Sequence, residues 1–349
     1  MFLSTLRART GRPQQPGSSA STSAISVAVA LLGAIMRLAG LLLVTAAGTF
    51  TLLSFSPVDP IRAYIGSDLL HVPPDQYPLI AARWGLDLPL WERFVHWFVQ
   101  ILQGDFGYSM LYNAPVSHVI GERFATSFML LFSAWVFSGC VGLAMGMTAG
   151  RYLNRWPDRL LSTVSYVLVS LPTFWIGLLL LSLFAVTLNW APICCAWTPG
   201  SDAQTATWGD KLRHLVLPML ALGLLGVGNI ALHTRSRVAE VMNSEFIRFA
   251  HAQGDKGWPL INFHVLRHAL TPAVCLQFAS VGELIGGSLL AEKIFAYPGL
   301  GQATVDAGLR GDIPLLMGIV MLCTVLVFIG NSIANSLLLR LNRGVVRPS

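Results

Sequence analysis

The chain has 349 residues, of which 54% are hydrophobic and only 11% are charged, and its mean hydropathy is +0.62. A soluble domain carries roughly 25% charged residues, so these charges are too few to cover a soluble protein of this size, and lipid is the expected solvent for the remainder. The net charge is +6, but the cations are scattered and do not form a stripe with interleaved aromatics, which argues against a nucleic-acid partner.

The first 36 residues are expected to form a disordered cytoplasmic tail. The stretch from Thr10 to Ser26 is rich in Ser, Thr, Ala, Gly and Pro, a composition typical of disorder. A cleaved signal peptide is the alternative, although no clear small-residue cleavage site precedes the first long apolar run. Met36 is an alternative translation start.

Six apolar runs have about the length of 20 residues that a helix needs to cross the bilayer core. Because backbone polar groups cannot face lipid unpaired, each run is expected to be helical. The expected spans are Leu38–Phe55, Phe124–Ala149, Leu161–Leu188, Leu215–Leu232, Ala273–Ala291 and Leu315–Leu339. Pro172 is expected to kink the third of them.

The orientation of the spans follows from the Lys and Arg residues in the loops. With the N-terminus in the cytoplasm, most of the 23 basic residues fall in short cytoplasmic segments, and the long outer loops carry more acids than bases. Both termini are therefore predicted to be cytoplasmic. The resulting segments are the tail 1–36, a first span with an outer insert 37–123, a five-helix core 124–339 and a cytoplasmic tail 340–349.

The outer insert Ser56–Arg123 is interrupted by seven prolines, which exclude long helices from most of it. Residues 90–103 are the exception, because their apolar residues recur at helical spacing. They predict a short amphipathic helix that lies on the membrane surface or on the protein body.

The longest cytoplasmic loop is expected at residues 234–270. Within it, Ser244–Gln253 is compatible with a helix, with Ser244 as its N-cap and Gly254 as a left-handed stop. A solvated basic loop without a partner is the alternative interpretation.

Sequence motifs for catalysis or nucleotide binding are absent. The chain has no GxxxxGK[ST] phosphate loop, no GxSxG, no HExxH and no CxxC. The adjacent Cys194 and Cys195 are not expected to form a disulfide, because a bridge between neighbours is strained. Energy for uphill transport would therefore come from a partner or from an ion gradient.

Glu283 is the one carboxylate expected in the middle of a span, where a charge costs about 3 kcal/mol on insertion scales. It lines a translocation path in one interpretation, and makes a packing hydrogen bond to a neighbouring subunit in the other. His233, His268 and Cys275 are metal ligands by type, and with Glu283 they suggest a transient metal relay. Interfacial or packed side chains are the default interpretation.

Two segments carry a resemblance to a known family. Ala250-x-Ala252-x-Gly254, followed by Arg267–Pro272, resembles the EAA loop of binding-protein-dependent ABC importer permeases, although Arg248 and Phe249 stand where that pattern has Glu and Ala. Glu292–Gly301 resembles the E-x-I-F-x-x-P-G-x-G signature of the dipeptide, oligopeptide and nickel permeases. Further matching segments are 56–60, 85–90, 104–109 and 170–175.

The resemblance implies a type I importer permease fold, all-α with six transmembrane helices, in a bacterial inner membrane. It also implies a second homologous permease, two cytoplasmic ATPase subunits, a periplasmic solute-binding protein and no cofactor or catalytic site. The implied ATPase-coupling loop contains Glu245, Ala250, Ala252, Gly254 and Arg267. The implied external gate loop contains Glu292, Phe295, Pro298, Gly299 and Gly301. The aromatic rings of Phe295 and Tyr297 are expected at the membrane interface.

The sequence is compatible with two kinds of cargo. Gly282–Gly287 is more similar to nickel permeases, which favours nickel or a small metal chelate, with a dipeptide or oligopeptide as the alternative. Two alternative functions belong to other protein classes. One is an ion-coupled secondary transporter that uses Glu283, for which inverted repeats and interrupted helices would be expected. The other is a membrane enzyme, which would need paired polar catalytic residues at one depth in the membrane.

Overall fold

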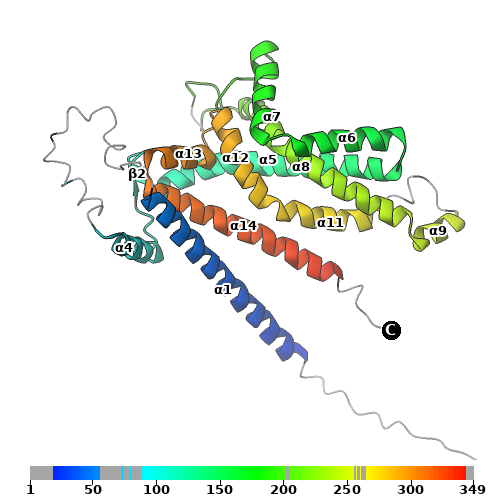
Figure 1. Ribbon diagram of the computed structural model, residues 1–349, viewed down its shortest axis with the longest axis horizontal. Helices are drawn as coiled ribbons and strands as arrows, with labels where there is room; N and C mark the ends of the chain where they lie inside the picture. Colours follow the sequence, from blue (N-terminus) through cyan, green and yellow to red (C-terminus); the bar gives the residue numbers. More distant parts are fainter. Residues whose placement is uncertain are drawn as a thin grey trace, which may run out of the picture. The chain divides into compact units, whose positions relative to one another are not determined.

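The computed structural model describes residues 19–55, 73, 79, 88–201, 204–254, 257, 260 and 265–342. The described residues are mostly helical (Figure 1). The elements are α1 (Ser19–Ser54), α4 (Leu90–Leu102), β1 (Tyr108–Ser109), β2 (Ala114–Pro115), α5 (Val116–Arg151), α6 (Trp156–Ser170), α7 (Thr173–Leu180), the π-helical η3 (Leu181–Thr187), α8 (Trp208–Met242), α9 (Glu245–Ala252), α11 (Leu266–Ala279), α12 (Val281–Ile294), α13 (Leu300–Arg310) and α14 (Ile313–Asn342).

The chain divides into two units, Met1–Val44 and Thr45–Ser349, and α1 contributes to both. In the second unit, β1 and β2 form one antiparallel pair, with Tyr108 opposite Pro115. The expected disordered tail extends too far, since helix α1 begins at Ser19. The apolar run from Val27 onward continues into the span, and helix formation propagates along such a chain more easily than it starts. The rest of that tail, residues 1–18, lies outside the described residues.

Four helices of the described residues are long and apolar enough to cross a membrane: Leu31–Ser54, Val116–Arg151, Trp208–Met242 and Ile313–Leu339. Two further candidates are helix pairs, α6 with α7–η3 and α11 with α12, bent by 105° and 52°. The count is therefore four spans, or six if each bent pair is one span. The expectation of a helical, multi-pass membrane protein is confirmed, with one short strand pair in addition.

The third and fifth spans are not the single helices that the apolar runs predicted. At the first break, Leu171 and Pro172 are extended, because proline lacks the N–H that would continue the helix and clashes with the preceding turn. At the second break the helix is interrupted at Ser280, which is followed closely by Gly282, and both are poor helix formers. Pro172 thus interrupts the third span and does more than kink it.

The closest helix pair of the second unit is α5 with α8. Glycines at every fourth position of α5, Gly142, Gly146 and Gly150, face α8. A Cβ on Gly146 would lie 2.5 Å from the Cβ of Thr234 and 2.6 Å from the carbonyl oxygen of Ala231. Small residues at this spacing let two backbones approach closely, as they do in membrane helix pairs. α8 is therefore held firmly against α5 along its length.

The amphipathic helix predicted at residues 90–103 is present as α4. Trp97 of α4 is buried in a cluster with Ala46 and Phe50 of α1 and Met317 of α14. Phe50 and Phe94 meet edge to face, with ring centroids 5.3 Å apart. One side of α4 therefore packs on the protein body.

Candidate functional site

The segment that resembles a coupling loop contains the end of α8, the short helix α9 and the start of α11 (Figure 1). α8 continues to Met242, and the short helix α9 follows after Asn243 and Ser244. On one side of α9, Ile247 and Ala250 are buried in an apolar cluster. The other members of that cluster are Val238 and Val241 of α8, Leu260, and Val265 and Ala269 at the start of α11. α9 is thus packed against the ends of two long helices.

The opposite side of α9 is bare. Glu245, Phe246, Arg248, Phe249 and Ala252 are all exposed, and Phe249 leaves 65% of its surface open. The ring of Phe246 lies 5.3 Å from the ring of His268 in α11. A cleft of about 450 Å³ reaches α9 at His251 and is also lined by Arg151, Arg155 and Asn243, but by none of the five exposed residues. The exposed side of α9 therefore presents two aromatic rings, those of Phe246 and Phe249.

The predicted boundaries of this helix are largely correct. Gly254 has φ +102°, a backbone region that favours glycine, and it ends the helix as expected. Ser244 stands at the N-cap position, but its hydroxyl donates to the carbonyl oxygen of Val241 and does not cap the helix. Ala250 is buried, whereas Ala252 is exposed. Arg267 belongs to the first turn of α11, and its side chain lies outside the described residues.

A buried ion pair, which the sequence did not reveal, ties α6 to α8 about two turns before α8 ends at Met242. The guanidinium of Arg235 donates from Nε and Nη2 to the two carboxylate oxygens of Asp158, with Nη2 2.9 Å from Oδ2. Asp158 is 2% exposed, and it also accepts hydrogen bonds from the backbone N–H of Asn154 and the hydroxyl of Ser162. The carboxylate is therefore fully partnered, as a buried charge must be.

Between the end of α12 and the start of α13, the segment Glu292–Gly301 folds around the side chain of Glu292. Glu292 is fully buried in the last turn of α12. Its Oε1 accepts from the hydroxyl of Ser127 in α5 (2.7 Å), and its Oε2 accepts from the backbone N–H of Gln302 (3.0 Å). The Ser127 hydroxyl oxygen in turn accepts from the N–H of Leu300 at 2.6 Å. Three separate parts of the chain are thus joined by one carboxylate.

The two glycines of this segment allow the close approach. A Cβ on Gly299 would lie 2.3 Å from both Glu292 Oε2 and Ser127 Oγ, and a Cβ on Gly301 would lie 2.9 Å from Glu292 Oε2. Either position therefore excludes a larger residue. Arg123 adds a hydrogen bond to the carbonyl oxygen of Gly299 (3.3 Å), and its guanidinium carbon lies 4.4 Å from the centroid of the Tyr112 ring. Burial raises the pKa of Tyr112.

The expectation that the aromatics of this segment lie at an interface is wrong for this chain. Phe295 and Tyr297 are each 2% exposed. Phe295 packs with Ala185, Leu217 and Ala221, and Tyr297 belongs to a second apolar cluster that includes Leu130 and Leu284. Burial of their large apolar surface outweighs the interfacial preference of aromatic rings. The segment is a packed turn, and Pro298 lies at its partly exposed corner.

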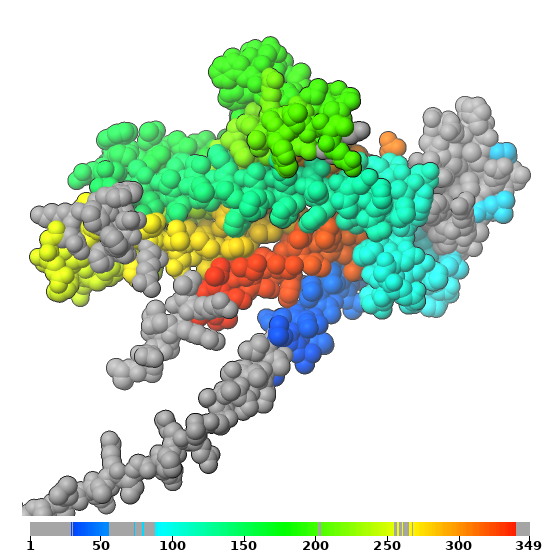
Figure 2. All heavy atoms as spheres, turned by 180° about the vertical axis from the view of Figure 1, so that it is seen from behind, coloured from blue at the N-terminus to red at the C-terminus, as the bar shows by residue number. Residues whose placement is uncertain are grey.

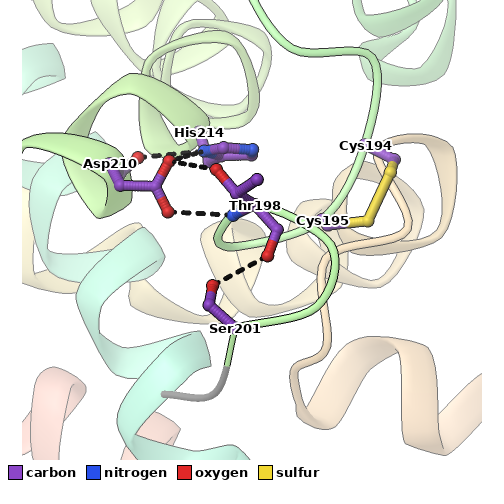
Figure 3. Close-up of a disulfide and its surroundings, with 6 residues drawn as sticks. All are labelled: Cys194, Cys195, Thr198, Ser201, Asp210 and His214. Atoms are coloured by element: carbon purple, nitrogen blue, oxygen red, sulfur yellow. Dashed lines mark hydrogen bonds and ion pairs between the residues drawn. A yellow bond between two sulfur atoms is a disulfide. The ribbon is translucent and has the colours of Figure 1, made fainter. Parts of the chain in front are cut away.

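Cys194 and Cys195 form a disulfide in the loop between η3 and α8 (Figure 3), contrary to the expectation from sequence. Cys195 has φ +76°, so the backbone turns at this point. The N–H of Cys195 donates to the carbonyl oxygen of Phe295 at 2.9 Å. Farther along the loop, Thr198 donates through its N–H and its hydroxyl to the carboxylate of Asp210 (Figure 3). The loop is therefore fastened both to α8 and to the turn after α12.

Glu283 lies on a face of α12 that no other part of the described chain covers. Glu283, Gly286 and Leu290 of α12 are exposed, at the spacing of one helix face, and Ala279, the last residue of α11, is exposed as well. A carboxylate in this position must meet another subunit or water, because lipid is too costly a surrounding. The structure therefore leaves open both interpretations of Glu283, a translocation path and a contact between subunits.

The residues suggested for a metal relay do not come together as a site. Among the described residues, no group of three or more His, Cys, Asp or Glu side chains is arranged to hold a metal ion. His233 and Cys275 line one groove of about 470 Å³ between α8, α11 and α14. His268 instead packs on Phe246, and Glu283 is outside the lining of that groove.

Residues 142–347 match the family described as binding-protein-dependent transport system inner membrane component. The chain belongs to this family, and it is therefore the membrane permease subunit of an ABC importer. Glutathione transport system permease protein GsiC of Salmonella typhimurium is 34% identical to it over 313 residues, covering 88% of this chain and 97% of the relative. GsiC of Escherichia coli is 32% identical over 315 residues, covering 89% and 97%.

The family assignment fixes several coarse properties of the chain. It is a multi-pass inner-membrane protein and a non-catalytic transport subunit, and it works with ATPase and solute-binding partners. Interrupted helices were expected for a secondary transporter, and they do occur here. That feature alone would have favoured the wrong class, and the family match decides against it.

Proposed function

We propose that the chain forms one half of the translocation pathway of an ATP-driven importer of small peptides. The observation that carries this proposal is the similarity over 88% of the chain to a glutathione permease, together with an exposed aromatic helix at the end of two long helices. The complete importer would contain a second, homologous permease, two ATPase subunits and a solute-binding protein. The similarity gives no support to nickel as the cargo.

α9 is the proposed coupling element. Its bare face carries Phe246 and Phe249, which suit a groove on a partner because aromatic side chains provide large, rigid contact areas. Its covered face is fixed to α8 and α11 through Ile247 and Ala250. A push on α9 would therefore move these two helices together, as rigid elements, and change the opening of the bundle.

The α12 face with Glu283, Gly286 and Leu290, together with Ala279 at the end of α11, is the proposed wall of the pathway. It is exposed in the single chain, and a second permease placed opposite would enclose it. The Glu283 carboxylate would then face the amino group of a peptide during passage. The turn Glu292–Gly301, with Phe295, Pro298, Gly299 and Gly301, would hold the outer end of this wall in place.

We place both termini, α9 and the loop 234–270 in the cytoplasm, on the basis of the distribution of Lys and Arg among the loops. The Cys194–Cys195 loop then faces the oxidising side, where disulfides persist. This orientation puts α9 on the side where ATP is available.

The test is uptake by the complete complex reconstituted in vesicles, with labelled glutathione, a neutral dipeptide and Ni²⁺ offered separately. ATP-dependent uptake of a peptide, abolished by a hydrolysis-deficient partner ATPase, is the expected result. Uptake driven by a proton gradient without ATP would support a secondary transporter. ATP-dependent uptake of Ni²⁺ alone would restore the nickel-type cargo.

A further inference from the structure

The helix α4 has an apolar surface that is wider than the part the protein covers. At about 100° per residue, its apolar side chains extend over an arc of about 200°, from Trp97 through Phe94 to Val99. The remaining arc carries Glu92, Arg93, His96 and Gln100.

About half of the apolar arc packs on α1 and α14 through Phe94, Trp97, Phe98 and Ile101. The other half is bare. Trp91 leaves 67% of its surface exposed, Val95 51%, Val99 43% and Leu102 72%. We call these four residues the bare strip.

The bare strip is continuous with a surface that faces lipid. The span Leu31–Ser54 ends where α4 packs on α1, and just there Leu52 and Phe55 are 76% and 80% exposed. In Figure 2, α4 (cyan) lies beside the last turns of α1 (blue). A helix attached at the end of a span, with a tryptophan at its edge, lies at the depth where aromatic residues prefer the membrane interface.

A groove of about 300 Å³ connects the two surfaces. It is lined by Ala47, Phe50, Thr51, Ser54 and Phe55 of α1 and by Leu90, Trp91 and Phe94 of α4. Its two hydroxyls are already used: Thr51 donates to the carbonyl oxygen of Ala47 and Ser54 to that of Phe50, each at 2.7 Å. The groove therefore offers a ligand apolar contacts, because both of its hydroxyl groups already donate hydrogen bonds to backbone carbonyl oxygens.

We propose that a phospholipid of the leaflet in which α1 ends is a resident ligand of this permease, with an acyl chain in the groove and along the bare strip. The polar arc of α4 then faces the headgroups and water. A solute-binding protein is the competing occupant. A protein bound to the bare strip would lie next to Leu52 and Phe55, which are at the end of a membrane span, and would therefore have to enter the membrane interface.

A photoreactive benzophenone amino acid in place of Val95 tests the proposal in the complete complex, in vesicles of phosphatidylethanolamine and phosphatidylglycerol. The matched control is the same substitution at Gln100, on the polar arc of the same helix. After illumination, the expected product at Val95 is an adduct with the mass of one phospholipid, several-fold more abundant than at Gln100. Val99 is the second strip position if the first variant does not assemble.

Crosslinking of Val95 to the solute-binding protein or to the second permease would overturn the proposal. Equal lipid adducts at Val95 and Gln100 would overturn it too, as would the absence of an adduct at both strip positions in an assembled complex.

A second measurement addresses the groove itself. Ala47→Phe, which fills it, is expected to reduce the phospholipid that remains bound after detergent exchange, whereas Gln100→Phe is not. Unchanged retention with Ala47→Phe would contradict the groove as the binding site.

Discussion

Replacing Gly299 by alanine tests how closely the turn after α12 is held by Glu292. The new Cβ would lie 2.3 Å from Glu292 Oε2 and from Ser127 Oγ, far inside van der Waals contact, and both atoms belong to buried side chains. Overpacking costs about 1 to 3 kcal/mol, and displacing one hydrogen bond of the buried carboxylate adds about 1 to 3 kcal/mol. The expected loss of stability is therefore about 2 to 6 kcal/mol.

Gly308→Ala is the matched control for this substitution. Gly308 lies in α13, and nothing lies within 4 Å of the position of its Cβ. Alanine is a better helix former by about 1 kcal/mol, so this variant is expected to be unchanged or slightly more stable. The assay is the fraction of purified permease complex that remains monodisperse after heating, measured together with peptide uptake. If Gly299→Ala survived heating as well as Gly308→Ala, the close packing around Glu292 would be refuted.

Three further predictions concern the other contacts. Asp158→Ala leaves the Arg235 charge without its carboxylate and is expected to destabilise the permease by about 3 to 5 kcal/mol. The exchange Asp158→Arg with Arg235→Asp is expected to recover part of that loss in the same heating assay. No recovery would mean that the ion pair itself does not stabilise the permease. Gly254→Pro is expected to insert normally but to abolish stimulation of the partner ATPase, measured as phosphate release, because the turn after α9 is lost; normal stimulation would contradict the coupling role. Glu283→Gln is expected to lower uptake of a peptide with a free amino group several-fold and that of its N-acetylated form little, and equal effects on both would indicate a packing role.

The local elements of this protein could be predicted from its sequence because short-range signals encode them. The amphipathic pattern of residues 90–103 and the glycine after residue 253 are such signals, and both elements are present. The apolar runs located the spans, but their continuity was overestimated. A run of apolar residues reports burial in lipid, and it does not report how Pro172 or Ser280 interrupts the backbone.

The contacts that hold the site together could not be predicted, because they join residues far apart in the chain. Asp158 and Arg235 are separated by 77 residues, and Ser127 and Glu292 by 165. In the sequence, Asp158 and Arg235 were only loop charges used to decide orientation. The motif Glu292–Gly301 predicts an external gate loop, but it gives no sign that the Glu292 carboxylate is buried.

In the proposed transport cycle, α9 passes force from a partner ATPase to the membrane helices. The most direct measurement is crosslinking of a single cysteine at Phe249, in a background without the five native cysteines, in the assembled complex, with a cysteine at Gln100, on the polar arc of α4, as the control. We expect Phe249→Cys to crosslink to the ATPase subunit and to be protected from a membrane-impermeant thiol reagent added outside, and Gln100→Cys to do neither. Labelling of position 249 from outside, without any crosslink to the ATPase, would show that α9 is not the coupling element.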